Sequence, residues 1–77
     1  MEDIKVLQHI QKLIAAEDSL YSKSDLSEKD KKRLRHIEVE LDQCWDLLRQ
    51  RRALRDVGKN PDEAAVRPPN IVENYEQ

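Results

Sequence analysis

Phenylalanine is absent from this 77-residue chain, and the sequence has one glycine, one cysteine, three prolines and only 4% aromatic residues. Sheets favour aromatic and β-branched residues, so this scarcity argues against a β protein. The single cysteine, Cys44, excludes an internal disulfide framework. Neither a signal-peptide pattern nor an apolar run of membrane-spanning length is present, so we expect a cytoplasmic protein with no membrane partner.

Charged residues, in contrast, make up 39% of the chain, which has a formal net charge of −2. This composition is typical of long charged helices. A chain of this length forms one domain at most, and it buries only about 60% of its unfolded surface. Small scaffolds without disulfides or metals often gain stability by association. We therefore predict a single all-α domain over residues 1–77, able to associate into a helical bundle.

The first segment has apolar residues at three- and four-residue steps, the spacing of one helical face. They are Ile4, Val6, Leu7, Ile10, Leu13, Ile14, Leu20 and Tyr21. This pattern predicts a helix over about residues 2–21, followed by a connection over residues 22–27. Ser27 with Asp30 three residues later resembles a capping box, which predicts that a second helix begins at about residue 28.

The second helix has a 3-4-3-4 apolar pattern, which is the spacing of a coiled-coil seam. Its members are Leu34, Ile37, Leu41, Cys44 and Leu48. Gly58 followed by Pro61 predicts an end at about residue 57. Because a short connection places amphipathic helices side by side, we predict an antiparallel, coiled-coil-like two-helix hairpin. Asn60 and Pro61 then predict a short helix over about residues 61–66. Pro68 prevents this helix from continuing, so residues 67–77 are predicted to form a tail.

Beyond Leu48 the seam turns from apolar residues to arginine. We expect Glu2 or Asp3 of the first helix to reach Arg51 or Arg52 there, as exposed ion pairs worth about 0–1 kcal/mol each. The arginines that follow Leu48, called the arginine block, are Arg49, Arg51, Arg52 and Arg55. They can instead bind a protein partner, or nucleic acid through phosphate contacts.

A second apolar line on this helix points away from the seam. It consists of Leu47, Leu54 and Val57, and we expect it to be covered either by Ile71, Val72 and Tyr75 of the tail or by a second copy of the chain. Trp45 flanks the seam and is the first candidate for a self-association interface, because interface cores are enriched in Trp, Tyr and Arg. The candidate partner-binding residues are therefore Trp45, Arg49, Arg51, Arg52, Leu54, Arg55 and Tyr75.

No constellation in the sequence indicates catalysis, a metal or a cofactor. Cys44 and His36 are eight residues apart on one helix, or about 12 Å along its axis, too far for a nucleophile–base hydrogen bond. Cys44 is interpreted as a core residue because it occupies the seam. His36 and Glu40 have one-turn spacing, but no HExxH motif is present, so both histidines of the chain are expected on the solvated surface.

The run from Arg35 to Ala53, followed by Gly58 and by residues 60–64, 66–68 and 72–77, resembles a family of short bacterial proteins, domain-of-unknown-function family 2630. The resemblance covers the second helix and the tail, whereas the first helix matches only in pattern. It implies a small bacterial cytosolic protein and carries no activity.

The sequence thus favours a non-enzymatic helical protein–protein interaction or self-assembly module, whose partner is a second copy or an unidentified protein. The alternative is a nucleic-acid-associated protein that binds through the arginine block, and a steep loss of binding with salt would favour it. An enzyme is the third hypothesis, but the chain lacks a glycine-rich phosphate loop and any pair of groups close enough for acid–base chemistry.

Overall fold

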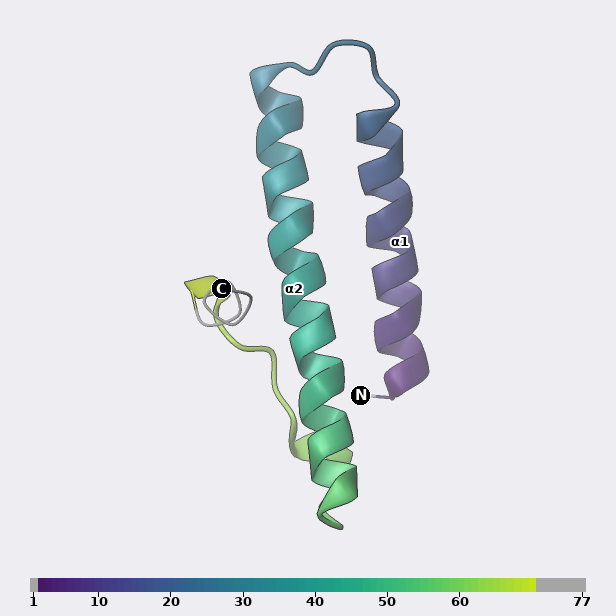
Figure 1. Cartoon of the computed structure of the whole chain (residues 1–77), viewed down its shortest axis with the longest axis vertical. Helices are drawn as coiled ribbons and strands as arrows, with labels where there is room; N and C mark the ends of the chain where they lie inside the picture. Colours follow the sequence, from purple (N-terminus) through teal and green to yellow (C-terminus); the bar gives the residue numbers. More distant parts are fainter. Residues whose placement is uncertain (1, 71–77) are drawn as a thin grey trace.

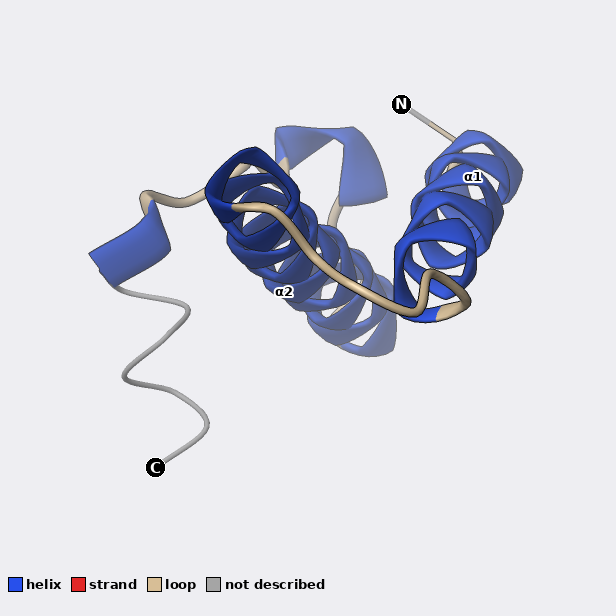
Figure 2. Cartoon of the chain, turned by 90° about the horizontal axis from the view of Figure 1, so that it is seen from above, coloured by secondary structure: helices blue, strands red, loops and turns tan. Residues whose placement is uncertain are grey.

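The structure, a computed structural model, describes residues 2–70 and contains no strand among them. Helix α1 spans Asp3–Tyr21, helix α2 spans Glu28–Asp56, and a 3-10 turn, η1, spans Pro61–Glu63. The two helices lie antiparallel, side by side, and the chain after η1 runs back along α2 on the side away from α1 (Figure 1, Figure 2). The predicted all-α fold with two packed helices and a short third helical turn is confirmed.

Helix α2 begins at a complete capping box. The Ser27 hydroxyl accepts a hydrogen bond from the Asp30 backbone N–H at 3.1 Å, and the Asp30 carboxylate accepts one from the Ser27 backbone N–H at 3.2 Å. The Lys23 ammonium lies 3.2 Å from the same carboxylate. Two backbone donors at the start of the helix are therefore satisfied, which explains why α2 begins at the predicted residue.

The core consists of two apolar clusters along the seam between α1 and α2. The cluster near the connection contains Leu13, Leu20, Leu34 and Ile37, and the cluster near the chain start contains Val6, Ile10 and Leu47. Leu41 and Cys44 are half-buried and pack against both clusters, so they join them into one seam. Burial of each large apolar side chain is worth about 1.5–3 kcal/mol, so this seam is the main apolar contribution to stability.

The apolar stripe predicted for the first helix divides into a buried and an exposed half. Ile4, Leu7, Ile14 and Tyr21 remain 60%, 43%, 40% and 59% exposed. The reason is geometric, since a single neighbouring helix covers only the narrow line of side chains that points directly at it.

The third helical segment is shorter than the predicted range of 61–66. Asn60 caps it by accepting a hydrogen bond from the Asp62 backbone N–H at 3.0 Å, but Ala64 is already extended at φ −66° and ψ 144°. Residues 64–67, called the strap below, then follow α2 as an extended segment. Pro68 favours this outcome because a residue that precedes proline avoids the helical region.

The capping box gives the first prediction. Ser27→Ala should lower the free energy of unfolding by about 1 kcal/mol, because the Asp30 N–H loses its acceptor. Chemical denaturation followed by circular dichroism measures this change. Ser24→Ala, in the exposed connection, is the matched control and should have almost no effect; equal losses in the two variants would contradict the role of the cap.

Candidate functional site

Arg51 joins the three structural elements at one end of the hairpin. Its side chain is only 8% exposed, and its Nε donates to an Asp3 carboxylate oxygen. Its Nη1 donates to Asp62 of η1 at 2.9 Å. Arg55 adds a contact from Nη1 to the other Asp3 oxygen at 2.8 Å. The sequence correctly placed Asp3 beside Arg51, but the expectation of an exposed pair is wrong, because Arg51 is buried at this junction.

A second polar cluster fixes the strap to α2. Asp46 is 1% exposed, and both of its oxygens accept hydrogen bonds from the Arg67 guanidinium, through Nε at 2.8 Å and through Nη2. The Gln50 amide also donates to Asp46, at 2.8 Å. A bidentate carboxylate–guanidinium pair has strict geometry, so it holds the strap in one position along the helix.

Two glutamines of α2 bind the strap backbone. The Gln50 amide donates to the Ala65 carbonyl at 2.8 Å and accepts from the Ala65 N–H at 3.4 Å. The Gln43 amide donates to the Arg67 carbonyl at 3.1 Å. Extended backbone needs such partners because it has no internal hydrogen bonds. This role was not predicted from the sequence, although Gln43, Asp46 and Gln50 lie at three- and four-residue steps and so form one polar line on the helix.

These ion pairs shift the ionisation of three carboxyl groups. The hydrogen bonds from Arg67 lower the pKa of Asp46, and those from Arg51 lower the pKa of Asp3 and of Asp62, partly opposed by desolvation. A folded-state pKa below the unfolded value stabilises the fold at every pH above the unfolded value. That stabilisation is lost as the pH falls through the folded pKa, so both clusters weaken in acid.

The predicted second apolar line does not exist as one surface. Leu47 is buried in the core cluster with Val6 and Ile10, and Ala64 of the strap packs against that cluster. Leu54 is half-buried and Val57 is 69% exposed. The expectation that Leu47 points away from the seam is therefore wrong, because Val6 and Ile10 of α1 pack with it and Ala64 of the strap packs against the same cluster. The residues proposed as cover, namely Ile71, Val72 and Tyr75, lie outside the described residues.

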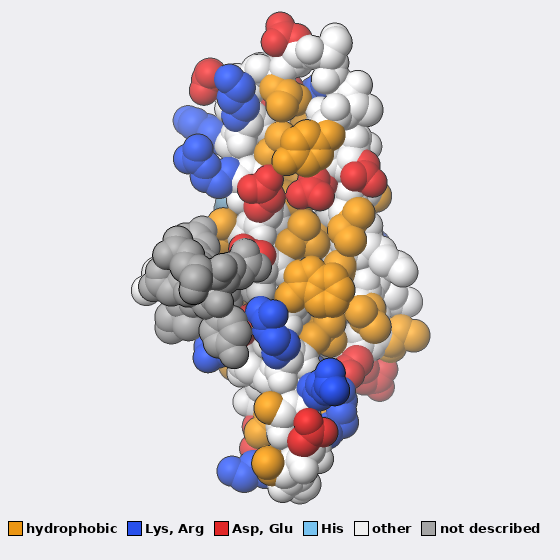
Figure 3. All heavy atoms as spheres, in the orientation of Figure 1, with side chains coloured by type: hydrophobic (Ala, Val, Ile, Leu, Met, Phe, Trp, Pro, Cys, Tyr) orange, Lys and Arg blue, Asp and Glu red, His pale blue; other side chains and the backbone are white. Residues whose placement is uncertain are grey.

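An exposed apolar band crosses both helices on one face of the molecule (Figure 3). On α1, Leu7 and Ile14 are seven residues apart and therefore share one side of the helix. On α2, Trp45 is 44% exposed and lies between the half-buried Leu41 and Leu48. We call these five residues, Leu7, Ile14, Leu41, Trp45 and Leu48, the apolar face.

A hydrogen bond shows that the exposed sides of the two helices point in the same direction. The Tyr21 hydroxyl donates to Glu38 at 3.1 Å, and this contact raises the pKa of Tyr21 because the carboxylate disfavours the phenolate. Tyr21 follows Ile14 by seven residues, and Glu38 precedes Trp45 by seven. The apolar face therefore ends at this acidic side chain, and Lys and Arg side chains lie beyond it in the opposite direction (Figure 3).

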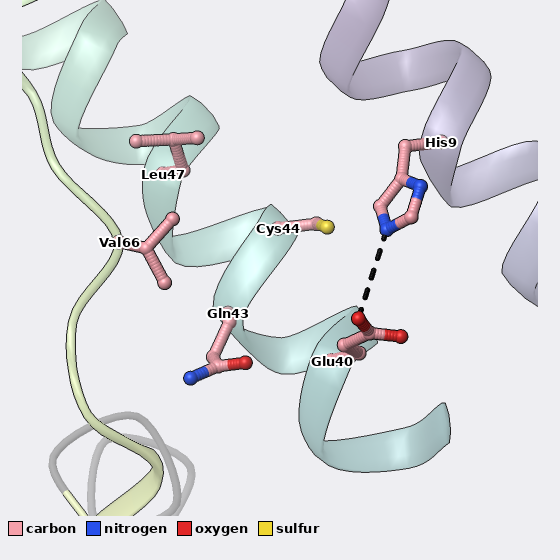
Figure 4. A pocket seen from close by; sticks show the side chains of 6 residues that line it. All are labelled: His9, Glu40, Gln43, Cys44, Leu47 and Val66. Atoms are coloured by element: carbon pink, nitrogen blue, oxygen red, sulfur yellow. Dashed lines mark ion pairs between the residues drawn. The ribbon is translucent and has the colours of Figure 1, made fainter. Parts of the chain in front are cut away.

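A small pocket lies between α1, α2 and the strap (Figure 4). It has a volume of about 130 Å³ and is lined by His9, Glu40, Gln43, Cys44, Leu47 and Val66. His9 Nε2 lies 3.9 Å from Glu40, and both side chains are about half exposed. Burial raises the pKa of the Cys44 thiol, which disfavours the reactive thiolate. Pockets for small-molecule ligands usually have volumes of about 300–1,000 Å³, so this one is small.

Another hollow of about 500 Å³ lies against Gln8, Gln11, Lys12 and Ala15, all on the outer side of α1, so a single helix forms it. Within residues 2–70, no group of three His, Cys, Asp or Glu side chains is arranged to hold a metal ion. None of the described helices has the length and apolar character needed to cross a membrane.

The candidate partner-binding residues fall into separate places. Trp45 is on the apolar face, while Arg51 and Arg55 both contact Asp3 at the junction. Arg52 is exposed and has no ion pair within residues 2–70. Arg49 is exposed, and its charge helps to lower the pKa of Asp46. Leu54 is half-buried, and Tyr75 lies beyond the described part of the chain.

Comparison with known proteins places this architecture among uncharacterised sequences. The family model described as "Protein of unknown function (DUF2630)" matches residues 2–77, which extends the resemblance seen in the second helix over α1 as well. Uncharacterized proteins of Mycobacterium bovis and Mycobacterium tuberculosis are each 52% identical to the chain over 77 residues, covering 95% of this chain and 88% of the relative. No solved structure matches it significantly.

The lowered pKa values give a prediction for acid stability. The free energy of unfolding should stay nearly constant between about pH 7 and pH 5 and fall below about pH 4, where carboxylates with an unfolded pKa of about 3.9 become protonated. Asp46→Asn should cost about 1–3 kcal/mol at neutral pH, because charged hydrogen bonds to Arg67 are lost. Urea unfolding at several pH values should show this difference shrinking in acid. Asp25→Asn is the control, and a constant difference for Asp46→Asn would contradict the prediction.

Arg51 and Arg52 provide a matched pair of neighbours, one buried and paired, the other exposed. Arg51→Gln should lower the melting temperature clearly, because Asp3 and Asp62 lose their common partner and η1 loses its contact with the hairpin. Arg52→Gln should lower it less. Thermal unfolding by circular dichroism compares the two, and equal effects would show that the junction does not hold the elements together.

Proposed function

This chain belongs to the DUF2630 family of proteins of unknown function, and we propose that it is a non-enzymatic helical protein–protein interaction module. The observation that carries the proposal is the apolar face, where both helices expose large side chains on the same side (Figure 3). Contiguous exposed apolar surface with a polar rim is typical of protein interaction sites.

The composition of the apolar face suits a protein partner. Trp45 is central in it, and tryptophan is among the residues most enriched in the energetic centres of interfaces. Leu7 and Ile14 are 43% and 40% exposed, so covering the rest of each side chain would contribute about 1 kcal/mol, which is the remaining fraction of the value for full burial.

The polar clusters support this proposal because they leave the apolar face open. The strap runs along the far side of α2, and the Arg51 junction fixes the end of the hairpin. A face whose two helices are held in fixed positions is pre-organised, so a partner loses less conformational freedom when it binds. Within residues 2–70, no second layer lies on this face of the two helices, and stable domains usually have one.

The chemistry of the remaining sites favours a binding role over catalysis. The pocket beside Cys44 is small, and its thiol is disfavoured as a nucleophile. His9 and Glu40 are 3.9 Å apart and about half exposed, and within residues 2–70 neither side chain has a further ion pair or hydrogen bond that would orient it. These features offer neither an enclosed site nor an activated group.

Nucleic-acid binding through the arginine block has less support. Arg51 and Arg55 both contact Asp3, so binding of phosphates by these two would have to compete with an ion pair that joins the two helices. Binding that falls steeply as the salt concentration rises would favour this alternative.

Site-specific photo-cross-linking tests the interaction function in the native host. A photoreactive phenylalanine analogue in place of Trp45 or Leu7 should form adducts with protein, because a partner covers these positions. The same analogue in place of Gln8, on the outer side of α1, or of Val57, which is 69% exposed, is the matched control. Cross-linked bands detected through an affinity tag on the chain measure the outcome.

Two results would contradict the proposal. Absence of protein adducts at both face positions would mean that nothing covers the face. Equal adducts at Gln8 and Val57 would mean that the contacts are not specific. As a further check, Leu7→Glu should remove the adducts formed at Trp45, since a charge on the apolar face opposes burial.

A further inference from the structure

We propose that the partner on the apolar face is a second copy of this chain, packed antiparallel about a two-fold axis that passes at the level of Trp45. This inference rests on the proposed interaction function and names its partner. The axis lies in the plane of the interface and perpendicular to the helices, so that α2 of one copy lies on α2 of the other and α1 lies on α1. The result is a four-helix bundle, which gives each hairpin its missing second layer.

The spacing of charges along α2 carries the inference. Glu38 precedes Trp45 by seven residues and Arg52 follows it by seven. Each therefore lies about 10.5 Å from Trp45 along the axis and on the same side of the helix. A two-fold rotation at Trp45 exchanges these two levels, so Glu38 of each copy faces Arg52 of the other. A symmetric dimer needs such a self-complementary surface.

Both charged groups are available for this contact. Arg52 is exposed and has no ion pair within residues 2–70. The Glu38 carboxylate accepts one hydrogen bond, from Tyr21 at 3.1 Å, and a carboxylate has capacity for about four. The bond from Tyr21 holds Glu38 at the edge of the apolar face, where a guanidinium of the second copy would arrive.

The apolar residues of α1 follow the same symmetry. Ile10 of α1 and Cys44 of α2 pack in one core cluster, so the level of Trp45 falls near Ile10. Leu7 and Ile14 lie on opposite sides of that level, and the rotation brings Leu7 of one copy to the level of Ile14 of the other. Apolar side chains therefore meet apolar side chains along both helices while the charged pairs close the rim, as in typical interfaces.

A parallel arrangement of the copies is less favourable. If the two-fold axis ran along the helices, the acidic ends of both copies would lie at the same level, and Glu38 would approach Glu17 and Glu38 of the second chain. Like charges placed opposite one another oppose association. The antiparallel arrangement removes this repulsion and replaces it with two Glu–Arg pairs, so the charge pattern selects one orientation.

Charge exchange tests the pairing with purified full-length protein. Sedimentation equilibrium should show a dimer for the natural chain. Glu38→Arg and Arg52→Glu should each weaken dimerisation roughly tenfold, because each creates two like-charge contacts, while the double variant should recover most of the affinity. Lys12→Glu, on the outer side of α1, is the charge control. Circular dichroism of each variant confirms that the helices remain folded. Equal weakening by Lys12→Glu, or no recovery in the double variant, would overturn the Glu38–Arg52 pairing.

Thiol cross-linking tests the orientation in a Cys44→Ala background, which removes the native thiol. A mixture of Glu38→Cys and Arg52→Cys chains should form mixed dimers with a short bifunctional thiol reagent, because facing helices lie about 8–10 Å apart. Glu38→Cys alone should cross-link poorly, since the two copies of that position lie about 21 Å apart along the axis. Efficient cross-linking of Glu38→Cys with itself would overturn the antiparallel arrangement.

The two proposals fail in different ways. A natural chain that remains monomeric at high concentration overturns the dimer, whereas photo-cross-linking at Trp45 in the host judges the interaction function independently. Adducts only with a different protein would reject the second copy as the occupant and leave the interaction function standing. Adducts with the chain itself, together with Glu38–Arg52 cross-links, would support both.

Discussion

The buried guanidinium of Arg51 is the contact on which the arrangement of the chain depends. It binds carboxylates from the start of α1 and from η1, so one side chain fixes the separation of the helices and the path of the chain after α2. A buried charge that loses a partner carries a large desolvation cost, so each carboxylate stabilises the buried position of the Arg51 guanidinium. Their cooperation makes a short chain with little apolar core adopt one arrangement. The strap can then reach Asp46, because η1 has already turned the chain back along α2 (Figure 1).

Helix α2 has 29 residues, many of them charged, and three of its sides make different contacts. One side packs against α1 through the apolar seam, the next binds the strap through Gln43, Asp46 and Gln50, and a third carries Trp45 and remains open. Polar side chains hold the strap on α2 through hydrogen bonds, and Ala64 adds an apolar contact with the core cluster. The exposed side of the helix pair is left with large apolar side chains, among them Leu7, Ile14 and Trp45.

Patterns within one helix, and contacts that follow from pairing the two helices about their connection, could be predicted from the sequence, whereas the contacts between α2 and the strap could not. The seam around Leu34 and Ile37 and the capping box of Ser27 follow from spacing within one helix, and the Asp3–Arg51 contact follows from pairing the helices about their connection. Asp46 was missed because a charged residue within a helical pattern is usually solvated, and its burial depends on Arg67, which lies 21 residues further along. Leu47 was misplaced for a related reason. The 3-4-3-4 pattern assigned only Leu48 to the seam and left out its neighbour Leu47. Helix α1 is close enough to pack against both residues.

The apolar residues of α1 show that a helical stripe in a small protein can contain both core residues and exposed residues. A single partner helix covers Val6, Ile10 and Leu13, while Leu7 and Ile14 beside them stay exposed. A wider stripe than one neighbour can cover predicts either a third helix or another molecule, and within residues 2–70 no third long helix exists. The strap cannot take that place, because Arg67 and Gln50 hold it on the far side of α2. Among residues 2–70, the contacts that complete the fold are therefore the same contacts that leave Trp45 44% exposed.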